Sequence, residues 1–234
     1  MIMRKCFVLL LFLLLSLSCS AADKRFTVVS VDTSHEKLEL FLNDEKGNPF
    51  KRFDRLASWL QAKNKRLLFA MNAGMYHKDF KPVGLLVLNG QQLSPLNQAN
   101  GYGNFFLKPN GVFLVSAAGP RVIASSEYSA LAKGVRLATQ SGPLLVRRGV
   151  IHSAFNKNSS SRLIRNGVGV SGRKIFFVIS EKPVSFHELA IFFRDGLHCQ
   201  NALYLDGVVS SLYSTALHRS DANAELGPIV GVVQ

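Results

Sequence analysis

Alternating apolar and polar positions run through most of this chain, and they predict β-strands joined by short turns. Residues 26–31 and 37–42 alternate in this way and are followed by a turn-forming cluster at 44–49. The pair Asn89-Gly90 separates two alternating segments and is a strong hairpin signal. The predicted hairpins pair residues 83–88 with 91–96, 104–107 with 112–116, 144–147 with 150–152, and 167–170 with 174–179. Further strands are predicted at residues 67–71, 135–139, 202–205 and 229–233.

Two segments change to helical spacing. Residues 54–63 place three apolar side chains on one helix face, namely Leu56, Trp59 and Leu60. A second helix is predicted to begin at Ser185, which forms a capping box with Glu188, and to end near Gly196. Its apolar stripe consists of Leu189, Phe192 and Phe193. These elements predict a single α+β domain, with a strand-rich mixed sheet or two packed sheets, many hairpins and two or three packed helices.

The first 22 residues have the order of a secretory signal peptide. Arg4 and Lys5 precede an apolar run of 11 residues, and small residues lead to Ala22. A retained membrane anchor is the weaker interpretation, because a spanning helix needs roughly 20 apolar residues. Lipid attachment at Cys19 is a third interpretation, but the preceding Ser-Leu-Ser suits a lipoprotein signal poorly. We therefore expect a periplasmic or secreted domain at residues 23–234, with no stable membrane span after cleavage.

The charge of the chain is unusual, whereas its other composition is that of a globular protein. Hydrophobic residues make up 47% and charged residues 18% of the sequence. The full chain has a net charge of +13, and loss of Arg4 and Lys5 with the signal lowers it to +11. Such an excess suits anionic envelope polymers or phosphate-bearing substrates, although it also serves solubility alone. We expect no nucleic-acid partner, because the sequence lacks the zinc-finger, basic-helix and RNA-binding motifs.

Cysteine use limits how the exported domain is held together. Cys6 and Cys19 lie in the predicted signal, so Cys199 alone remains and no internal disulfide is expected. Free cysteine is usually buried, and Cys199 precedes an apolar strand. We therefore predict that Cys199 is a core residue and not a nucleophile.

Four polar, glycine-containing loops follow apolar strands, at residues 72–76, 140–143, 161–167 and 201–211. Such loops are common places for functional sites, although Gly and Asn also serve turns alone. Within them, Asp206 is the sharpest candidate, because it ends a buried strand where desolvation raises a carboxyl pKa. An Asx-turn would explain Asp206 equally well. Arg162 and Arg165 are its natural counter-charges, and each could hold a phosphate through two hydrogen bonds.

Other titratable residues give weaker signals. His77 could act as a general acid or base, although a lone loop histidine is more often a surface residue. Glu188 is accounted for by its capping box. The remaining histidines have no metal-ligand spacing and the chain has no G-x-S-x-G motif, so we expect no metal, no cofactor and no α/β-hydrolase.

Five ordered blocks resemble the phosphodiester glycosidase family and cover most of residues 67–233. They are MNAGMY (71–76), QSGPLLV (140–146), SRLIRNGVGV (161–170), SFHELAIFF (185–193) and NALYLDGVVSSLY (201–213). The resemblance implies hydrolysis of a sugar–phosphate glycosidic bond, with a sugar phosphate or anionic glycan as substrate. It implies that Asp206 and Arg162 are catalytic, and His77, which directly follows the first block, is the third catalytic candidate. The residues that it implies bind substrate are Asn72, Gly74, Tyr76, Gln140, Ser141, Gly142, Asn201, Gly207 and Ser210.

The resemblance leaves two points open. Val208 stands where many relatives have a second glycine, and a branched residue there narrows the loop. Glycosidases usually carry two carboxylates, and Asp79, or His77 as the acid, could complete the pair with Asp206. A non-catalytic carbohydrate- or wall-polymer-binding protein on the same scaffold is therefore the alternative, followed by a structural or partner-binding domain. An enzyme of this family is expected to lose turnover, but not its fold, in Arg162→Ala or Asp206→Asn.

Overall fold

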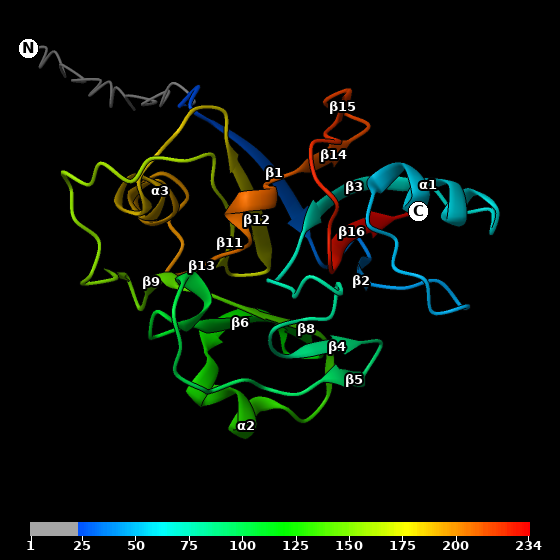
Figure 1. Ribbon diagram of the computed structural model, residues 1–234, viewed down its shortest axis with the longest axis horizontal. Helices are drawn as coiled ribbons and strands as arrows, with labels where there is room; N and C mark the ends of the chain where they lie inside the picture. The colour runs from blue at the N-terminus through cyan, green and yellow to red at the C-terminus, as the bar shows by residue number, and fades with distance from the viewer. Residues whose placement is uncertain (1–22) are drawn as a thin grey trace, which may run out of the picture.

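The computed structural model describes residues 23–234 and builds them into three β-sheets flanked by helices (Figure 1). Every strand pairing in this part of the chain is antiparallel. The first sheet has six strands in the order β1 (Phe26–Asp32), β12 (Lys174–Ser180), β11 (Asn166–Ser171), β13 (Asn201–Tyr204), β9 (Leu144–Arg147) and β10 (Val150–Ile151). The predicted α+β class is confirmed.

The other two sheets have five strands each. The order in the second sheet is β15 (Arg219–Ser220), β14 (Leu212–Ser214), β3 (Leu67–Asn72), β16 (Ile229–Val233) and β2 (Leu38–Phe41). The order in the third sheet is β5 (Gln91–Ser94), β4 (Leu86–Leu88), β8 (Val135–Ser141), β6 (Gly111–Ser116) and β7 (Gly119–Ala124). Sequence reasoning expected one mixed sheet or two packed sheets, and the strands divide into three.

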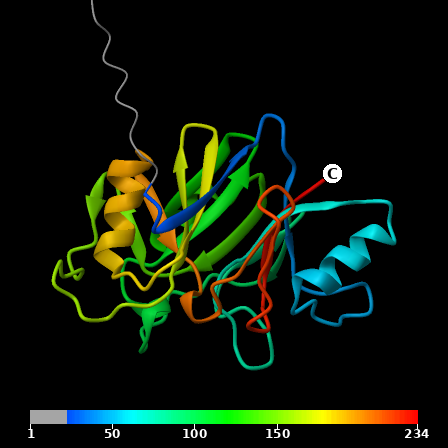
Figure 2. The same cartoon turned by 90° about the horizontal axis from the view of Figure 1, so that it is seen from above.

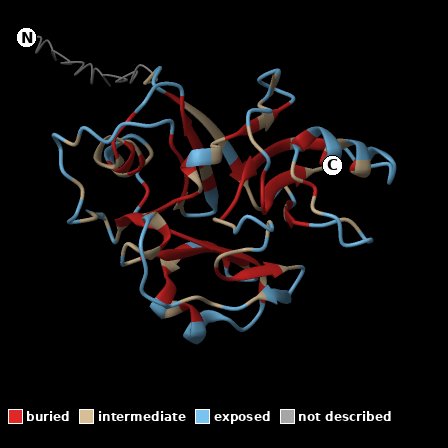
Figure 3. Cartoon of the chain, viewed as in Figure 1, coloured by how far each residue is buried: buried red, intermediate tan, exposed pale blue. Residues whose placement is uncertain are grey.

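The main core lies where the three sheets face one another. Its buried side chains come from all three sheets, and Figure 3 shows the buried residues gathered in the strands. The ring of Phe177 on β12 lies 5.0 Å from that of Phe69 on β3 and 5.9 Å from that of Phe113 on β6. Phe177 therefore joins the three sheets through one side chain. Burial of such aromatic side chains dominates core energetics.

Helices cover the outer faces of the sheets. Helix α1 (Phe53–Gln61) packs Phe53, Leu56 and Leu60 against the second sheet. Helix α3 (Phe186–Ile191) continues as a π-helical segment, η3 (Phe192–Gly196), and packs against the first sheet. The two helices lie at opposite ends of the molecule (Figures 1 and 2). The shorter helical segments are α2 (Tyr128–Leu131), η1 (Asn104–Phe106), η2 (Ser125–Glu127) and η4 (Gly207–Val209).

The predicted start of the second helix is confirmed in detail. The Ser185 hydroxyl accepts the Glu188 backbone N–H at 3.2 Å, and the Glu188 carboxylate accepts the Ser185 backbone N–H at 2.9 Å. The prediction for Cys199 is also confirmed, since its side chain is fully buried in the cluster beneath α3. This burial raises the pKa of the Cys199 thiol to about 12, which keeps the thiol protonated and unreactive.

One predicted hairpin is wrong. Residues 104–107 do not form a strand, because Asn104–Phe106 is the short helix η1. The true partners of β6 are β7 and β8. Strand β7 was missed because its Gly119-Pro120 start resembles a turn. Proline lacks a backbone N–H, but β7 is the edge strand of its sheet, so no neighbouring strand needs a hydrogen bond from Pro120.

The predicted signal peptide at residues 1–22 lies outside the described residues. Among residues 23–234, no helix combines the length and apolar character needed to cross a membrane.

Candidate active site

The predicted polar loops meet where strands from all three sheets end. Strand β3 of the second sheet ends at Asn72, β8 of the third sheet ends at Ser141, and β13 of the first sheet ends at Tyr204. The Gly74 backbone N–H, just beyond β3, donates to the Thr139 hydroxyl on β8 at 3.0 Å. The Tyr204 N–H donates to the carbonyl of Pro143, beyond β8, at 3.1 Å. Three of the four loops are thus directly connected.

The Asn72 side chain is the central link of this cluster. It is buried, and its amide donates to the Asp206 backbone carbonyl at 2.9 Å. Its carbonyl accepts the Asn166 side-chain amide at 2.7 Å and the Ser211 backbone N–H at 3.0 Å. One side chain therefore joins β3, β11 and the loop that carries Asp206. Buried polar groups that are satisfied in this way hold a loop in one position.

Asp206 is half-buried at the end of the β13 strand, as the sequence suggested. Burial raises the pKa of its carboxyl above the ordinary value of 3.8, and a hydrogen bond from the Val208 backbone opposes the shift. Within residues 23–234, no lysine, arginine or histidine forms a salt bridge with it. Ionisation of this carboxyl therefore costs free energy. A pKa shifted in this way is typical of carboxylates at functional sites.

Two tyrosine hydroxyls share the electrostatic environment of Asp206. Burial, together with the charges of Asp206 and Glu225, raises the pKa of Tyr76 to about 12. Burial also raises the pKa of Tyr204, with Arg165 opposing and Asp206 adding to the shift. Both hydroxyls stay protonated at neutral pH and remain hydrogen-bond donors.

The buried guanidinium of Arg165 lies next to the Tyr204 hydroxyl. It donates to the Val184 carbonyl at 2.9 Å and to the Ser161 carbonyl at 3.2 Å, and its third contact is the Tyr204 hydroxyl at 3.5 Å. It also lies 3.8 Å from the centre of the Phe186 ring. None of the salt bridges within residues 23–234 includes Arg165, although the side chain is 1% exposed. A buried cation without an acidic partner makes the positive potential beside Tyr204 strong.

Arg162 lies in a different environment. Its guanidinium is about half exposed and forms a salt bridge with Glu188 at 2.9 Å. The same Glu188 oxygen accepts from Arg25 at 3.1 Å. Burial acts to raise the pKa of Glu188, but hydrogen bonds from Ser185 and Arg162 outweigh it and lower that pKa. No contact within the described part of the chain joins Arg162 to Asp206, so its catalytic role stays a prediction.

Comparison with known proteins decides the family. The family model for phosphodiester glycosidases matches residues 65–233, which include every loop of this cluster. The chain belongs to the phosphodiester glycosidase family. An uncharacterized protein of Escherichia coli strain K12, YigE, is 33% identical over 207 residues, which is 87% of this chain and 80% of that protein.

Two solved structures share the fold of this family member. One is the zebrafish N-acetylglucosamine-1-phosphodiester alpha-N-acetylglucosaminidase catalytic domain, auto-inhibited by its pro-peptide, with a TM-score of 0.60 and 13% identity. The alignment covers 91% of this chain and 84% of that chain. The other is a hypothetical protein from Synechocystis, with a TM-score of 0.52, 16% identity and coverage of 89% and 59%. At these identities the likeness is one of fold.

Several predicted substrate-binding residues of this family member make structural contacts. The buried Gln140 side chain accepts the backbone N–H groups of Leu85 at 3.0 Å and Asn97 at 2.9 Å, and so holds the loop that precedes η1. A Cβ atom at Gly74 would overlap the Gln140 backbone carbonyl, and one at Gly142 would lie 2.7 Å from the Asn110 Cβ. These positions allow the strand ends to approach closely. Ser141 is fully buried, and no described residue partners its hydroxyl.

Within residues 23–234, neither His77 nor Asn201 forms a hydrogen bond with the Asp206 carboxylate. His77 is exposed in a tight turn, where its backbone N–H donates to the Lys81 carbonyl at 2.8 Å. In the same turn, Asp79 forms a salt bridge with Lys81 at 2.8 Å, and hydrogen bonds from Lys81 lower the Asp79 pKa. Asn201 begins β13 and accepts the Arg148 backbone N–H at 3.0 Å. It is five residues before Asp206, or about 16 Å along an extended chain.

Sequence reasoning missed two members of the cluster, Tyr204 and Asn166. Tyr204 was assigned only to a buried strand, and its position directly before the Leu-Asp end of that strand was the available signal. Asn166 follows Arg165 and was included only as part of a loop. Within residues 23–234, no group of three or more His, Cys, Asp or Glu side chains is arranged to hold a metal ion.

Gly207 gives a direct test of how closely this cluster is packed. A Cβ atom at Gly207 would overlap the Tyr204 hydroxyl, while Ser210 donates to the Gly207 carbonyl at 3.0 Å. We expect Gly207→Ala to displace Asp206 and to lower kcat/KM by about 10²-fold, because small misplacements cost that much. The matched control is Val208→Ala, whose side chain is 86% exposed. Steady-state kinetics that find equal activity in both variants would contradict this packing.

Proposed function

We propose that this chain hydrolyses a sugar–phosphate glycosidic bond in phosphate-bearing glycans of the cell envelope. The supporting observation is the half-buried Asp206 carboxyl group, whose residue is anchored through its backbone carbonyl to Asn72 where the three sheets meet, and whose charge raises the pKa values of Tyr76 and Tyr204. Family membership supports the reaction class. The basic charge of the chain supports a phosphate-bearing substrate.

The reaction needs fewer groups than ordinary glycoside hydrolysis. A phosphate leaving group is a weak base, so it departs with little protonation. The site then requires one carboxylate at the anomeric carbon and hydrogen-bond donors for the phosphate oxygens. Asp206 provides the carboxylate, and it acts once ionised as nucleophile, base or oxocarbenium stabiliser. The protonated hydroxyl of Tyr76, released from the Glu225 carbonyl that it contacts at 2.5 Å, provides a donor.

Arg165 acts through Tyr204 in this proposal. Because its guanidinium is buried, it positions the tyrosine hydroxyl and does not touch substrate. Arg162, which is half exposed, is the candidate contact for the substrate phosphate. Its salt bridge with Glu188 must then open or be shared when phosphate binds.

The salt bridge changes what is expected from removing Arg162. A phosphate contact made equally in substrate and transition state affects KM, not kcat. We therefore expect Arg162→Ala to raise KM about 10-fold to 100-fold, the equivalent of one charge-assisted hydrogen bond, with kcat little changed. Glu188→Gln, which frees Arg162, is expected to lower KM or leave it unchanged. A loss of kcat as large as that of Asp206→Asn would instead make Arg162 a catalytic group.

The function is tested by incubating the purified protein with UDP-N-acetylglucosamine or an aryl sugar phosphodiester and measuring the released sugar. Saturable release supports the proposal. Binding of the sugar phosphodiester without release would favour the alternative of a non-catalytic carbohydrate-binding protein.

Export is a separate part of the proposal and rests on the composition of residues 1–22. We expect the chain recovered from the cells that make it to begin at Asp23. Intact mass measurement of that chain checks the prediction. A mass that includes residues 1–22, or a lipid on Cys19, would contradict cleavage after Ala22.

A further inference from the structure

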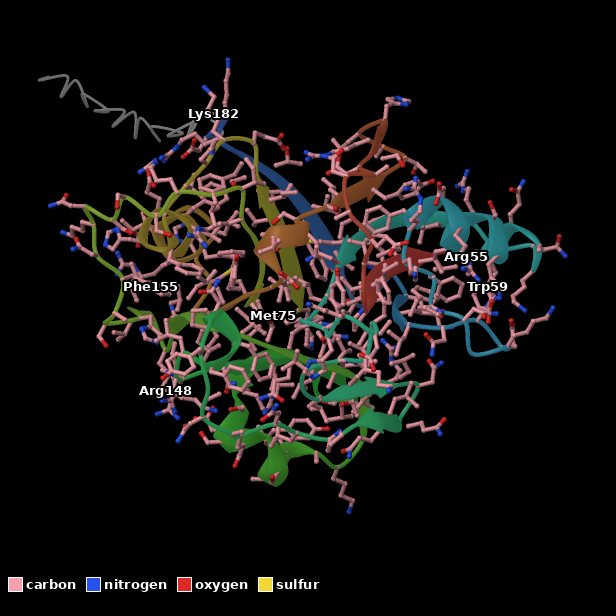
Figure 4. All side chains as sticks on the ribbon, in the orientation of Figure 1. Arg55, Trp59, Met75, Arg148, Phe155 and Lys182 are labelled. Atoms are coloured by element: carbon pink, nitrogen blue, oxygen red, sulfur yellow. The ribbon has the colours of Figure 1, made fainter. Side chains whose placement is uncertain are left out.

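A basic cavity lies beside the turn between β9 and β10, away from the Asp206 cluster. Its volume is about 350 Å³, and Leu144, Val150 and Ile151 contribute apolar surface to it. Arg147, Arg148 and His152 contribute its polar surface. In Figure 4, Arg148 points outward at the edge of the molecule, whereas Met75, a residue of the 72–76 loop, lies near the centre of the view. We call this space the β9–β10 cavity.

A second cavity adjoins the first. It has a volume of about 410 Å³ and is lined by Lys108, Asn110 and Ser125 among others. Pro109 lines both cavities. The His152 ring lies against this boundary, because its Nε2 is 3.0 Å from the Lys108 carbonyl. The two cavities therefore offer adjacent sites, enough for more than one unit of a chain-like ligand.

Positive charge exceeds negative charge around these cavities. The side chains of Arg147 and Arg148 bind the same oxygen of Glu127, at 2.8 Å and 3.1 Å. Lys108 donates to a backbone carbonyl, that of Gln98, at 3.3 Å. Two arginines thus share one carboxylate and Lys108 has no acidic partner among the described residues, so these four side chains sum to a charge of +2. The other Glu127 oxygen already accepts the Ala124 N–H at 3.1 Å.

Two further observations show that cationic side chains of this cavity are accessible to a ligand. Arg147 has 41% of its side chain exposed, although its Nε atom is buried without a partner among the described residues. Arg148 has 78% of its side chain exposed, and Val150 beside it is 68% exposed. Guanidinium groups of this kind bind phosphate oxygens through paired hydrogen bonds. Exposed aliphatic surface next to them suits the C–H face of a sugar ring.

The cavity is connected to the Asp206 cluster through one strand. The Arg148 N–H donates to Asn201 at 3.0 Å, and Leu144 pairs with Leu203. Asn201 begins β13, and Asp206 lies beyond its other end, about 16 Å away along the extended chain. The turn that carries Arg148 and the loop that carries Asp206 therefore lie at opposite ends of β13. This arrangement suits a neighbouring part of a longer substrate.

We infer that the β9–β10 cavity binds a second sugar–phosphate repeat of a polymeric anionic glycan while another repeat occupies the Asp206 site. The inference rests on the proposed function and specifies its substrate as a polymer of phosphate-linked repeats. An uncharged glycan would leave the excess positive charge around the cavity uncompensated. A free phosphate ion would leave the apolar wall of Leu144, Val150 and Ile151 unused.

The test compares two exposed arginines in hairpin turns. Arg148→Gln removes the charge at the cavity, and Arg173→Gln removes the same charge from the β11–β12 turn, where Arg173 contacts Ser34 at 3.1 Å. The probe is a short poly(glycerol phosphate) that carries N-acetylglucosamine, and its affinity is measured by calorimetry at several salt concentrations. We expect Arg148→Gln to weaken binding about 10-fold to 100-fold, as for one charge-assisted hydrogen bond. The slope of the logarithm of the binding constant against the logarithm of the salt concentration should become shallower by about 0.8, as for the loss of one phosphate contact on a polyanion.

The controls separate this inference from the proposed function. Hydrolysis of UDP-N-acetylglucosamine should be unchanged in Arg148→Gln, since this small substrate does not reach the cavity. Failure of the wild type to hydrolyse it would contradict the proposed function alone. Equal loss of polymer affinity in both arginine variants would overturn the inference, because bulk charge would explain it. Equally tight binding of uncharged dextran, or of single-stranded DNA with the same dependence on Arg148, would also overturn it.

Discussion

Replacing Asp206 by asparagine is expected to lower kcat/KM for a sugar phosphodiester by about 10²-fold to 10⁴-fold, the range for loss of a reacting acid–base group. Asparagine keeps the size of the side chain and leaves the Asp206 backbone carbonyl bonded to Asn72. It removes the ionised carboxylate on which the proposed chemistry depends. The measurement is steady-state kinetics on the purified variant, with folding checked by circular dichroism.

The raised pKa of Asp206 predicts the effect of the same change on stability. The pKa of Asp206 in the folded state lies above the unfolded value of about 3.8. Protonated Asp206 therefore makes its full contribution to the stability of the fold below about pH 3.8. This contribution is lost as pH rises through the folded-state pKa. At neutral pH the buried carboxylate therefore costs stability, and Asp206→Asn should have an equal or higher melting temperature. For the same reason, the acid limb of the kcat/KM profile should lie above pH 3.8.

Asp79→Asn is the matched control for Asp206→Asn. Asp79 is exposed and paired with Lys81, and it was the sequence-based candidate for a second carboxylate. The single-carboxylate mechanism predicts activity within about threefold of the wild type, as for loss of an exposed ion pair. A large loss of kcat in Asp79→Asn would restore the two-carboxylate mechanism. A large fall in the melting temperature of Asp206→Asn would mean that Asp206 is structural.

The second large effect is expected at Asn72. Asn72→Ala removes three hydrogen bonds and leaves the Asn166 amide, the Ser211 N–H and the Asp206 carbonyl without their partner. Each buried unsatisfied group costs about 1–3 kcal/mol. Because the surrounding structure relaxes in part, we expect the free energy of unfolding to fall by about 3 kcal/mol in total. The Asp206 loop also loses its anchor, so kcat/KM should fall by about 10²-fold.

Urea unfolding and kinetics on the same preparation measure both effects of Asn72→Ala. The control is Asn100→Ala, because Asn100 is exposed in the loop before η1. Its free energy of unfolding should change by less than about 0.5 kcal/mol. If Asn72→Ala were as stable and as active as Asn100→Ala, Asn72 would not hold the Asp206 loop.

Local signals in the sequence were enough to predict much of the fold. Asn89-Gly90 does join β4 to β5, because the pair suits a turn with positive φ, and both residues adopt it. The capping box at Ser185 depends on contacts three residues apart, so it too could be predicted. Each of these features is decided within a few residues of chain.

Features decided by distant segments could not be predicted in the same way. Phe105 and Phe106 have strand-like composition, but they form η1, in which the buried Phe105 ring lies close to the distant Gly84. The β6 strand also pairs with β8, which is not its neighbour along the chain, and no local pattern distinguishes β8 from other strands as its partner. The division into three sheets depends on such choices.

The candidate site shows the same limit. Asp206 and the Asn72 loop were predicted because each follows an apolar strand. The sequence did not predict which of Arg162 and Arg165 is buried and which is exposed. This difference depends on the backbone pairing of Leu163 with Val184. Arg165 follows this bridge, and its buried side chain contacts the Tyr204 hydroxyl. Arg162 precedes the bridge, and its side chain reaches Glu188 at the surface.

The central claim is that the bond broken joins the phosphate to the anomeric carbon, and that Asp206 is required for this cleavage. Hydrolysis of a sugar phosphodiester in water enriched in heavy oxygen tests both parts, with mass spectrometry of the two products. The account predicts that wild-type protein places the label in the released sugar and none in the phosphate, and that Asp206→Asn releases almost no product. Label in the phosphate, or undiminished release by Asp206→Asn, would contradict it.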